Sequence, residues 1–295
     1  MILVAGSANL DFVVRAHHIP APGETVMGRE FKTYPGGKGA NQAVACARAG
    51  AAPTAMLLAL GNDAFARPLE DSLTSAGVEL HVKRVKDQST GTAFICVSDD
   101  AENAITVAPG ANFALVPSDL IPLDRFTHLL LQLEIPVGTL TAYARSARAR
   151  NVKVVLNAAP AQELPDELLA LIDILIVNEG ELAVLAKHQG SIDQSLERIQ
   201  VPCVIVTLGR HGCRARIDGQ FLTQPAFTIN PVDTTGAGDT FCGAFVAAIC
   251  QGQSMADALL QASAASALAC LVPGAQSSIP THAQVQDFLK NHPIP

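Results

Sequence analysis

The sequence contains no tryptophan, and aromatic residues make up only 4% of its 295 positions. Proteins that bind single-stranded nucleic acid use aromatic side chains on which the bases stack, and a chain with so few aromatics is poorly suited to this. Lysine and arginine number 20 against 27 aspartates and glutamates, which gives a formal net charge of −7. An acidic chain lacks the basic surface that a phosphate backbone requires. We therefore expect no nucleic-acid partner.

Paired cysteines and long apolar runs are also missing. The seven cysteines are an odd number without paired or zinc-binding spacing, which is typical of reduced, mostly buried thiols in the cytosol. Met1–Val4 carries no basic leader and is too short for a signal peptide. No apolar run approaches the length that spans a membrane. These absences predict a cytoplasmic protein that makes no contact with a membrane.

The composition that remains is rich in apolar residues. They make up 49% of the chain, against 16% charged residues, so a large buried core is expected. A chain of 295 residues can form one large α/β domain or one domain with an appendage. We favour a single domain over residues 1–295.

The second half of the chain alternates apolar runs with helical patterns. Thr139–Arg150 and Glu181–Lys187 are the clearest of these helices. Near-continuous apolar strands between helices predict a mostly parallel sheet covered by helices on both faces. The strands are expected at Ile2–Ala5, Thr54–Leu60, Leu129–Leu133, Val152–Leu156, Ile172–Val177 and Cys203–Val206.

Shorter strands in the first half predict a second, small sheet. Residues 92–96 and 104–107 alternate in polarity around a polar turn and are expected to pair as antiparallel strands. They could pair with short strands expected at 12–14, 25–26 and 31–34. The predicted fold is therefore α/β, with a helix-flanked central sheet and a small β-sheet beside it.

Polar residues follow the apolar runs at the point where each run ends. The carboxyl ends of parallel strands meet at one edge of a sheet, and ligands bind at that edge. A single polar residue after a strand is common, but six at equivalent positions indicate a ligand-binding edge. They are Asn9, Asn62, Glu134, Asn157, Asn178 and Thr207.

The stretch Val232–Phe241 carries the clearest chemical signal. A glycine-rich turn follows the strand-like run Phe227–Ile229 and opens directly into a helical pattern. The first N–H groups of a helix lack internal partners and the helix dipole is positive there, so this end binds anions such as phosphate. Phe241 stands where the dinucleotide fingerprint needs a third glycine, and no P-loop lysine follows Gly238.

Asp239 lies in the first turn of this helix. A carboxylate beside a phosphate site could remove the proton from a substrate hydroxyl as the hydroxyl attacks the phosphate. The alternative is that Asp239 only caps the helix, as aspartate often does. The motif Gly-Ala-Gly-Asp alone leaves both interpretations open.

A second glycine-rich segment, Pro35–Asn41, opens a helix that is expected to reach about Arg48. Lys38 stands among its glycines, where both backbone and ammonium could reach a ligand. The spacing is not that of a P-loop, because Lys38 is followed by Gly39. Considered alone, the segment is more typical of a surface turn than of a ligand site.

Taken together, the two segments resemble the signatures of the ribokinase family, the sugar kinases grouped with the minor phosphofructokinase. Gly36–Ala43 is similar to the first signature and Asp233–Phe241 to the second, in the same order and far apart in the chain. The resemblance runs from Gly6 to about Pro280. It implies a three-layer fold in which strands at about 12–34 and 91–108 form a lid, and an ATP-dependent carbohydrate kinase.

The resemblance also implies roles for individual residues. Asp239 would be the general base, and the backbone N–H groups of Gly236, Ala237 and Gly238 would form an anion hole. The sugar would be held by Asp239 together with Asn9, Asp11, Gly37, Lys38, Asn41 and Glu134. The nucleotide would be bound by Asn178, Thr207, Leu208, Gly209, Arg210, His211, Gly212, Gly238 and Ser263.

Two metal ions are implied in addition to ATP. Glu181, with Asn178, would act on the Mg²⁺ and phosphate side, largely through water. A monovalent cation, potassium in our interpretation, would be surrounded by Asp233, Thr235, Ala269, Val272, Gly274 and Ser278. Ser263 stands where the family often carries histidine or asparagine, and Val272 where a longer basic residue is common.

The leading hypothesis is transfer of the ATP γ-phosphate to the 5-hydroxyl of D-ribose. A sibling kinase for deoxyribose, another sugar such as fructose, or a nucleoside is the alternative, and a non-catalytic sugar- or nucleotide-binding regulator is a different class. A dehydrogenase would share the sheet, but Gly6–Asn9 lacks its fingerprint glycines. A thin lid cannot bury both of its faces alone, so we expect a homodimer formed through the lid.

Overall fold

The computed structural model describes residues 1–100, 102–188 and 190–292. Within them the main sheet has nine strands, all parallel except β12, which pairs antiparallel with both of its neighbours. Along the sheet the strands are β13 (Gln220–Gln224), β12 (Cys213–Ile217), β11 (Cys203–Thr207), β10 (Ile174–Asn178), β9 (Lys153–Asn157), β8 (His128–Gln132), β1 (Ile2–Ala5), β4 (Thr54–Gly61) and β5 (Glu79–Val85).

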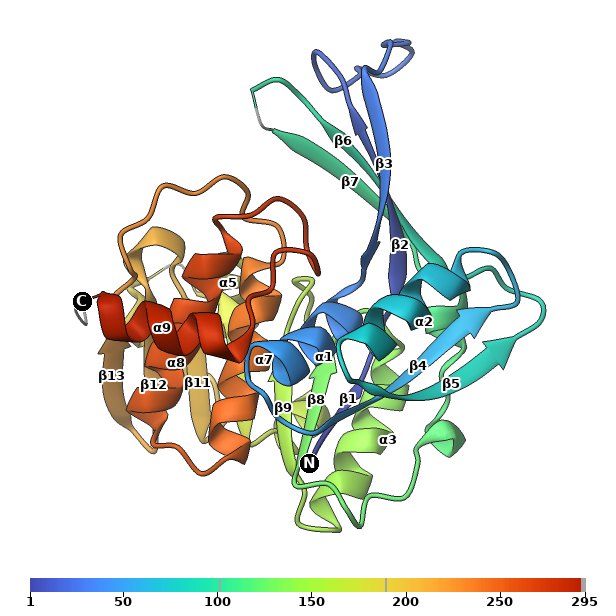
Figure 1. The fold of residues 1–295 in the computed structure, drawn as a ribbon. Helices are drawn as coiled ribbons and strands as arrows, with labels where there is room; N and C mark the ends of the chain where they lie inside the picture. Colours follow the sequence, from blue (N-terminus) through green and yellow to red (C-terminus); the bar gives the residue numbers. More distant parts are fainter. Residues whose placement is uncertain (101, 189, 293–295) are drawn as a thin grey trace.

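Helices cover both faces of this sheet, which gives three layers (Figure 1). One face carries α1 (Lys38–Arg48), α2 (Ala66–Ser75), α7 (Ala237–Cys250), α8 (Met255–Ala269) and α9 (His282–Asn291). The other face carries α3 (Val137–Arg148), α4 (Asp166–Leu169), α5 (Glu179–Ala186) and α6 (Ile192–Arg198). None of the described helices is both long and apolar enough to span a membrane.

Strand β1 shows how the sequence produces two cores from one sheet. Ile2 and Val4 pack into the apolar cluster beneath α1, α7 and α8, whereas Leu3 and Ala5 pack into the cluster beneath α3. All four side chains are fully buried. Successive side chains of a strand point to opposite faces, so a strand at the centre of a three-layer fold is apolar at every position.

A small second sheet projects from the main body (Figure 1). Its strands are β3 (Glu30–Gly36), β2 (Asn9–Arg15), β6 (Gly91–Val97) and β7 (Asn103–Ala108), in that order. The ring of Phe12 stacks on the rings of Phe31 and Phe94, with centroids 6.1 and 5.4 Å away. Phe31 and Phe94 remain 63% and 54% exposed, so this face of the sheet is apolar and uncovered.

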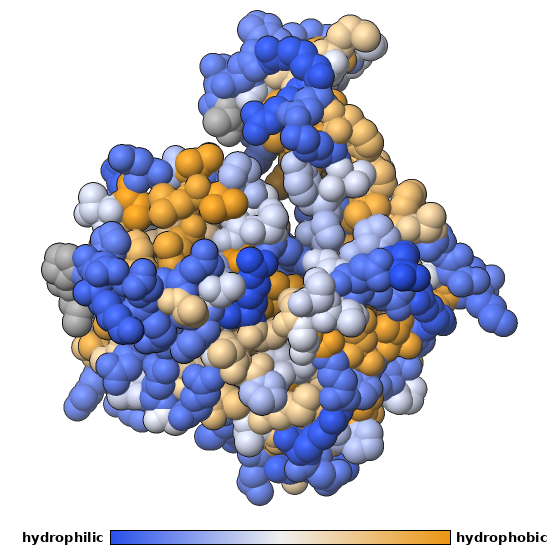
Figure 2. All heavy atoms as spheres, in the orientation of Figure 1, coloured by the Kyte–Doolittle hydropathy of each residue, from blue (hydrophilic) through white to orange (hydrophobic). Residues whose placement is uncertain are grey.

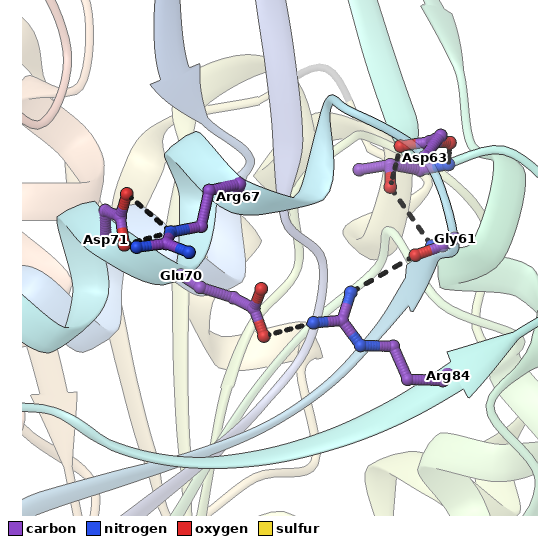
Figure 3. Close-up of polar contacts among 7 residues, drawn as sticks. Gly61, Asp63, Arg67, Glu70, Asp71 and Arg84 are labelled. Atoms are coloured by element: carbon purple, nitrogen blue, oxygen red, sulfur yellow. Dashed lines mark hydrogen bonds and ion pairs between the residues drawn. The ribbon is translucent and has the colours of Figure 1, made fainter.

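The root of the small sheet is fixed to the end of β4 by polar contacts (Figure 3). Asp63 accepts hydrogen bonds from the backbone N–H and the hydroxyl of Thr90, at 2.7 and 2.8 Å. Gly61 N–H donates to the Thr90 hydroxyl at 3.0 Å. Arg84 then joins the Gly61 carbonyl, at 3.2 Å, to the Glu70 carboxylate, at 2.5 Å. The small sheet thus departs from a rigid corner of the main body.

The predicted α/β fold with a mostly parallel sheet and a small additional sheet is confirmed. Two predicted strands were wrong. Residues 25–26 lie in an irregular connection between β2 and β3, and Phe227–Ile229 lies in an irregular segment after β13, where buried Phe227 packs edge-on against Phe288. Strands β5, β12 and β13 were not predicted. Their sequences alternate apolar with charged or polar residues because they form the two margins of the sheet, where one face is partly exposed.

Candidate active site

The polar residues predicted at the strand ends lie along the carboxyl edge of the parallel strands. Asn157, Asn178 and Thr207 are the last residues of β9, β10 and β11, and Glu134 follows β8. The amino-terminal ends of α1 and α7 meet at the same edge, where Asn41 contacts Asp239. Asn62 is exposed after β4 and is not among the contacts described below.

The residue before helix α7 has a backbone conformation that favours glycine. Gly236 is the residue before the helix and has φ 73°, in the left-handed region. Its carbonyl accepts the N–H and the hydroxyl of Thr240, at 2.8 and 2.9 Å. Nothing lies within 4 Å of a Cβ built on Gly238, so a ligand can approach the backbone there. Ala237 N–H donates to the Thr234 carbonyl at 3.2 Å and therefore also serves the turn.

The Asp239 carboxylate is only 9% exposed and is held by two consecutive residues of α1. Asn41 Nδ2 donates to Oδ2 and Gln42 Nε2 donates to Oδ1, each at 2.9 Å. Aspartate at this position could have served only as a helix cap. Instead its two oxygens accept hydrogen bonds from side-chain amides of α1, and these bonds fix the plane of the carboxylate.

Asn41 presents an unsatisfied acceptor at this site. Its Oδ1 atom is buried and has no hydrogen-bond partner among the described residues. A buried acceptor without a partner costs free energy, on the order of 1–3 kcal/mol, unless a ligand or water supplies a donor. A sugar hydroxyl beside Asp239 would meet this requirement.

Glu134 is tied to the segment after β1 and to the start of α1. Its Oε2 atom accepts the Ser7 hydroxyl at 2.5 Å and the backbone N–H of Lys38 at 3.0 Å. Ser7 Oγ in turn accepts the Gly39 N–H at 3.3 Å. These contacts place the Glu134 carboxylate beside the first turn of α1.

Asn9 is oriented by Asn112, which lies in the 3₁₀ turn η1 (Gly110–Ala114). Asn112 Nδ2 donates to Asn9 Oδ1 at 2.7 Å, and Asn112 Oδ1 accepts the Ala8 N–H at 3.0 Å. Because Asn9 Oδ1 is occupied in this way, Asn9 has its Nδ2 donor left for a ligand. Gly37 approaches the same segment closely, since a Cβ on it would lie 2.7 Å from Asn9 N.

Charged groups at this edge perturb one another. Burial, followed by the Glu134 and Asp239 carboxylates, raises the pKa of Asp11 to about 7. Burial opposes the charge of Lys38, but the Asp239, Glu134 and Glu181 carboxylates outweigh it and raise the pKa of this lysine. The Lys38 ammonium therefore stays charged inside an acidic cluster, where it can neutralise a phosphate.

Two cavities meet at the start of α7. One has a volume of about 420 Å³ and is lined by Gly209, Arg210, Gly212, Ser263 and the apolar side chains around Phe227 and Phe241. The other has a volume of about 150 Å³ and is lined by Lys38, Asn157, Asn178, Glu181 and Asp239. Thr207 and Gly238 line both. Leu208 and His211 are not among the lining residues of either.

A third cavity, of about 450 Å³, lies between the small sheet and the body (Figure 2). The small sheet contributes Asp11 and Tyr34, and the body contributes Asp233, Thr235 and Gly274. The Asp11 carboxylate on the small sheet therefore lines this cavity. This arrangement leaves room for a ligand covered by the small sheet.

Asn178 and Glu181 form a reciprocal cap at the start of α5. Asn178 N–H donates to Glu181 Oε2 and Glu181 N–H donates to Asn178 Oδ1, both at 2.8 Å. The second Glu181 oxygen takes no part in this pair. Burial raises the pKa of Glu181. This effect is larger than the opposing effects of the Asn178 N–H and the nearby Lys38 ammonium. A buried carboxylate in this state is suited to binding a cation or an ordered water.

The residues predicted to surround a monovalent cation come from two adjoining loops. Asp233 joins them, because its Oδ1 accepts the Thr235 N–H at 2.9 Å and its Oδ2 accepts the Gly274 N–H at 2.8 Å. Burial opposes the charge on Asp233, but these bonds lower its pKa. Ser278 donates its hydroxyl to the Ala275 carbonyl at 2.8 Å. Ala269 is buried, whereas Val272 is 45% exposed.

Four buried polar residues were missed by the sequence interpretation: Ser7, Gln42, Asn112 and Gln132. Gln42 lies within the first signature, but nothing in the spacing distinguishes it from a solvent-facing helix residue. Gln132 had the better signal, since an amide at the end of an apolar strand is unusual unless it meets a polar partner.

A helix amino terminus, a half-buried lysine and several carboxylates surround joined cavities at the ligand edge of an α/β sheet. This arrangement suits an enzyme that transfers phosphate to an alcohol. The comparisons with known proteins agree. Residues 1–282 match the family described as pfkB family carbohydrate kinase.

Three relatives show how far the likeness extends. A ribokinase of Haemophilus influenzae is 37% identical over 98% of both chains, and a deoxyribokinase of Salmonella typhi is 33% identical over 98% of both. The structure of Arabidopsis thaliana ribokinase complexed with ribose and ATP superposes with a TM-score of 0.90, at 33% identity over 99% of both chains. The chain therefore belongs to the pfkB family of carbohydrate kinases and is an ATP-dependent sugar kinase of the ribokinase type.

Proposed function

We propose that this kinase transfers the γ-phosphate of ATP to the 5-hydroxyl of D-ribose. The observation that carries the proposal is the position of Asp239, which lies beside the junction of two cavities and contacts Asn41, whose second amide atom lacks a partner. The ribokinase names of the relatives and the ribose–ATP complex of the Arabidopsis protein support this substrate pair.

The chemical step in this proposal is an in-line displacement. Asp239 accepts the proton of the attacking hydroxyl, and charge developing on the phosphoryl oxygens is stabilised by the N–H groups of Gly236, Ala237 and Gly238. Gly236 and Gly238 are better placed for this than Ala237, whose N–H contacts Thr234. Lys38 adds a positive charge on the same side. Asn9, Asp11, Gly37, Asn41 and Glu134 hold the sugar.

The nucleotide in this proposal occupies the 420 Å³ cavity, with Thr207–Gly212 along one side and Ser263 on the other. Asn178 and Glu181 act on its phosphates in the smaller cavity. Mg²⁺ fits this donor set, because the free Glu181 oxygen is a hard ligand and Mg²⁺ keeps several of its waters. It would supply charge neutralisation of the phosphates.

A monovalent cation, potassium in this proposal, fits beside Asp233. Its ligands would be this carboxylate with oxygens of Thr235, Ala269, Val272, Gly274 and Ser278. The loops are already joined there by two hydrogen bonds to Asp233. Since the 233–235 loop leads directly into the Gly236 turn, a cation that rigidifies it would hold the anion hole in place.

The chain in this proposal is one kinase domain over residues 1–295, with the small sheet as its lid. Closure of the lid over the 450 Å³ cavity would exclude water and limit hydrolysis of ATP. The exposed aromatic face of the lid would pair with a second copy to form a homodimer. All cysteines that the structure describes are free, as expected for a cytoplasmic protein.

A coupled assay across D-ribose, 2-deoxyribose, fructose and several nucleosides, with and without potassium, tests the substrate. Deoxyribose is the second candidate because a deoxyribokinase is 33% identical to this chain. We expect the highest kcat/KM with D-ribose, since a site built for a hydroxyl rejects an analogue that lacks it. Equal or higher kcat/KM with another acceptor would replace D-ribose in the proposal.

The variant Asp239→Asn tests the chemistry. We expect ATP affinity to change little and kcat to fall by roughly 100- to 10,000-fold, the usual size of general acid–base catalysis. Asp87→Asn, which removes an exposed carboxylate outside the site, is the matched control. Turnover at the wild-type rate in Asp239→Asn would exclude Asp239 as the general base. A wild-type protein that binds sugar and ATP without turnover would instead be a regulator.

A further inference from the structure

Gln42 is a fully buried polar side chain in contact with Asp239, and the mechanism above gives it no role. It is fully buried, so no ligand in any of the three cavities can touch it. Its Nε2 atom donates to Asp239 Oδ1 and to Asn157 Oδ1, both at 2.9 Å. Its Oε1 atom accepts Gln132 Nε2 at 2.7 Å. One side chain thus links the start of α7 with the ends of β8 and β9.

The orientation of this amide is determined by the chemistry at both ends of the network. An ionised Asp239 can only accept, so Gln42 must turn its NH₂ group toward it. The Ile176 carbonyl likewise can only accept, so Asn157 must direct its Nδ2 there, at 3.1 Å, and its Oδ1 toward Gln42. The remaining Gln42 oxygen then faces a donor on Gln132. Every link has one allowed direction, so the network cannot relax by flipping an amide.

The backbone around this network is shaped to accommodate it. Gly6 follows β1, and a Cβ there would overlap Gln132 Oε1, so a larger residue would displace the side chain that reaches Gln42. Gln132 is itself fully buried. The centre of the sheet therefore accommodates the Gln132 amide, whose hydrogen bond in the described residues goes to the Gln42 amide.

We infer that Gln42 is a positioning residue for the phosphotransfer, acting through Asp239; this inference rests on the proposed role of Asp239 as the base. Asn41 and Gln42 differ in what they do. Asn41 contacts the carboxylate and keeps a buried acceptor without a partner, whereas the amide of Gln42 is fully engaged by Asp239, Asn157 and Gln132. Gln42 thereby fixes Asp239 Oδ1 relative to the ends of β8 and β9.

The Asp239 carboxylate stands in a crowded polar neighbourhood. It contributes to the raised pKa of Asp11 on β2, of Glu181 on α5 and of the Cys242 thiol on α7. It also contributes to the raised pKa of Lys38 on α1. An amide N–H that is buried and oriented by its own partners holds this carboxylate in a position that solvent could not impose.

The experiment compares kcat and KM of the wild type, Gln42→Met and Gln42→Glu. Methionine keeps the length and volume but removes the donor. We expect kcat at pH 7 to fall roughly 10- to 100-fold, as for loss of one hydrogen bond to a charged group. KM for sugar and ATP should stay within about twofold, because Gln42 lines none of the three cavities.

Gln42→Glu is a second variant in case Gln42→Met fails to fold. Glutamate can still accept the Gln132 amide, but it replaces the donor to Asp239 by a like charge, so kcat should fall at least as far as in Gln42→Met. Gln261→Met is the control, because Gln261 is also buried but lies on α8 and bonds Gln253. It should keep the wild-type kcat and KM.

A rise in KM with kcat unchanged, or a fall in kcat of the same size in Gln261→Met, would mean that Gln42 only supports the fold, and the inference would be wrong. Wild-type kinetics in both Gln42 variants would also overturn it. Failure of the base itself is separate: it would appear as turnover in Asp239→Asn, whatever the Gln42 variants show.

Discussion

Replacing Asp11 with asparagine should make the unliganded protein more stable while weakening sugar binding. The Asp11 carboxyl faces Glu134 and Asp239, and its pKa is raised from 3.8 to about 7, mainly by burial. A difference of about 3 pKa units corresponds to about 4 kcal/mol at 1.36 kcal/mol per unit. Asp11 retains partial contact with water in the cavity. We therefore expect Asp11→Asn to gain about 2–4 kcal/mol above pH 7.

The pH dependence of this gain follows from the direction of the shift. Between pH 4 and 7 the unfolded chain has released the Asp11 proton while the folded protein still holds it, so the wild type loses stability as pH rises through this window. Asparagine carries no such proton. The difference in unfolding free energy between variant and wild type should therefore grow from pH 4 to pH 7 and level off above it.

Urea unfolding at pH 4.5, 6 and 8, followed by far-UV circular dichroism, measures this difference; the chain has no tryptophan to report by fluorescence. Asp87→Asn, on the surface, is the control and should show a small difference that does not change over this range. A stability difference for Asp11→Asn that stays constant with pH would refute the reasoning, because it would mean that burial does not oppose ionisation of Asp11.

Two further predictions concern assembly and magnesium. Phe94→Glu, on the exposed aromatic face of the lid, should convert a dimer to a monomer in sedimentation experiments, whereas Phe113→Glu, equally exposed but outside the lid, should not; a wild-type monomer would contradict the proposed dimer. Glu181→Gln should raise the Mg²⁺ concentration for half-maximal turnover by at least tenfold without unfolding α5, since glutamine can still complete the cap; unchanged Mg²⁺ dependence would exclude Glu181 from the metal side.

The sequence was sufficient for the central strands because they are buried on both faces. Near-continuous apolar runs such as Leu129–Leu133, interrupted only by Gln132, are typical of buried strands, and the structure places β8 there. The margins of the sheet carried no such signal. In β12, Arg214 and Arg216 alternate with buried Cys213 and Ala215, and both arginines bond to groups on or beside α6, which a single strand's pattern does not reveal.

Of the candidate site, the sequence revealed the parts that depend on local structure. The turn at Gly236 and the helix after it follow from glycine content and apolar spacing, and the structure shows both. Contacts between distant segments could not be predicted in the same way. Asn112 reaches Asn9 across 103 positions of sequence, and Gln42 reaches Asp239 across 197, so both depend on the final packing of separate elements.

The two glycine-rich helix starts look alike in sequence but differ in what the glycines permit. At α7, nothing lies near a Cβ built on Gly238, so the missing side chain leaves space for a ligand. At α1, a Cβ on Gly37 or Gly39 would lie 2.7 or 2.6 Å from the backbone of Asn9 or Ser7. The glycines of α1 therefore let the helix pack directly against the end of β1. That packing brings Asn41 and Gln42 within reach of Asp239, so residues of the first signature position the carboxylate of the second.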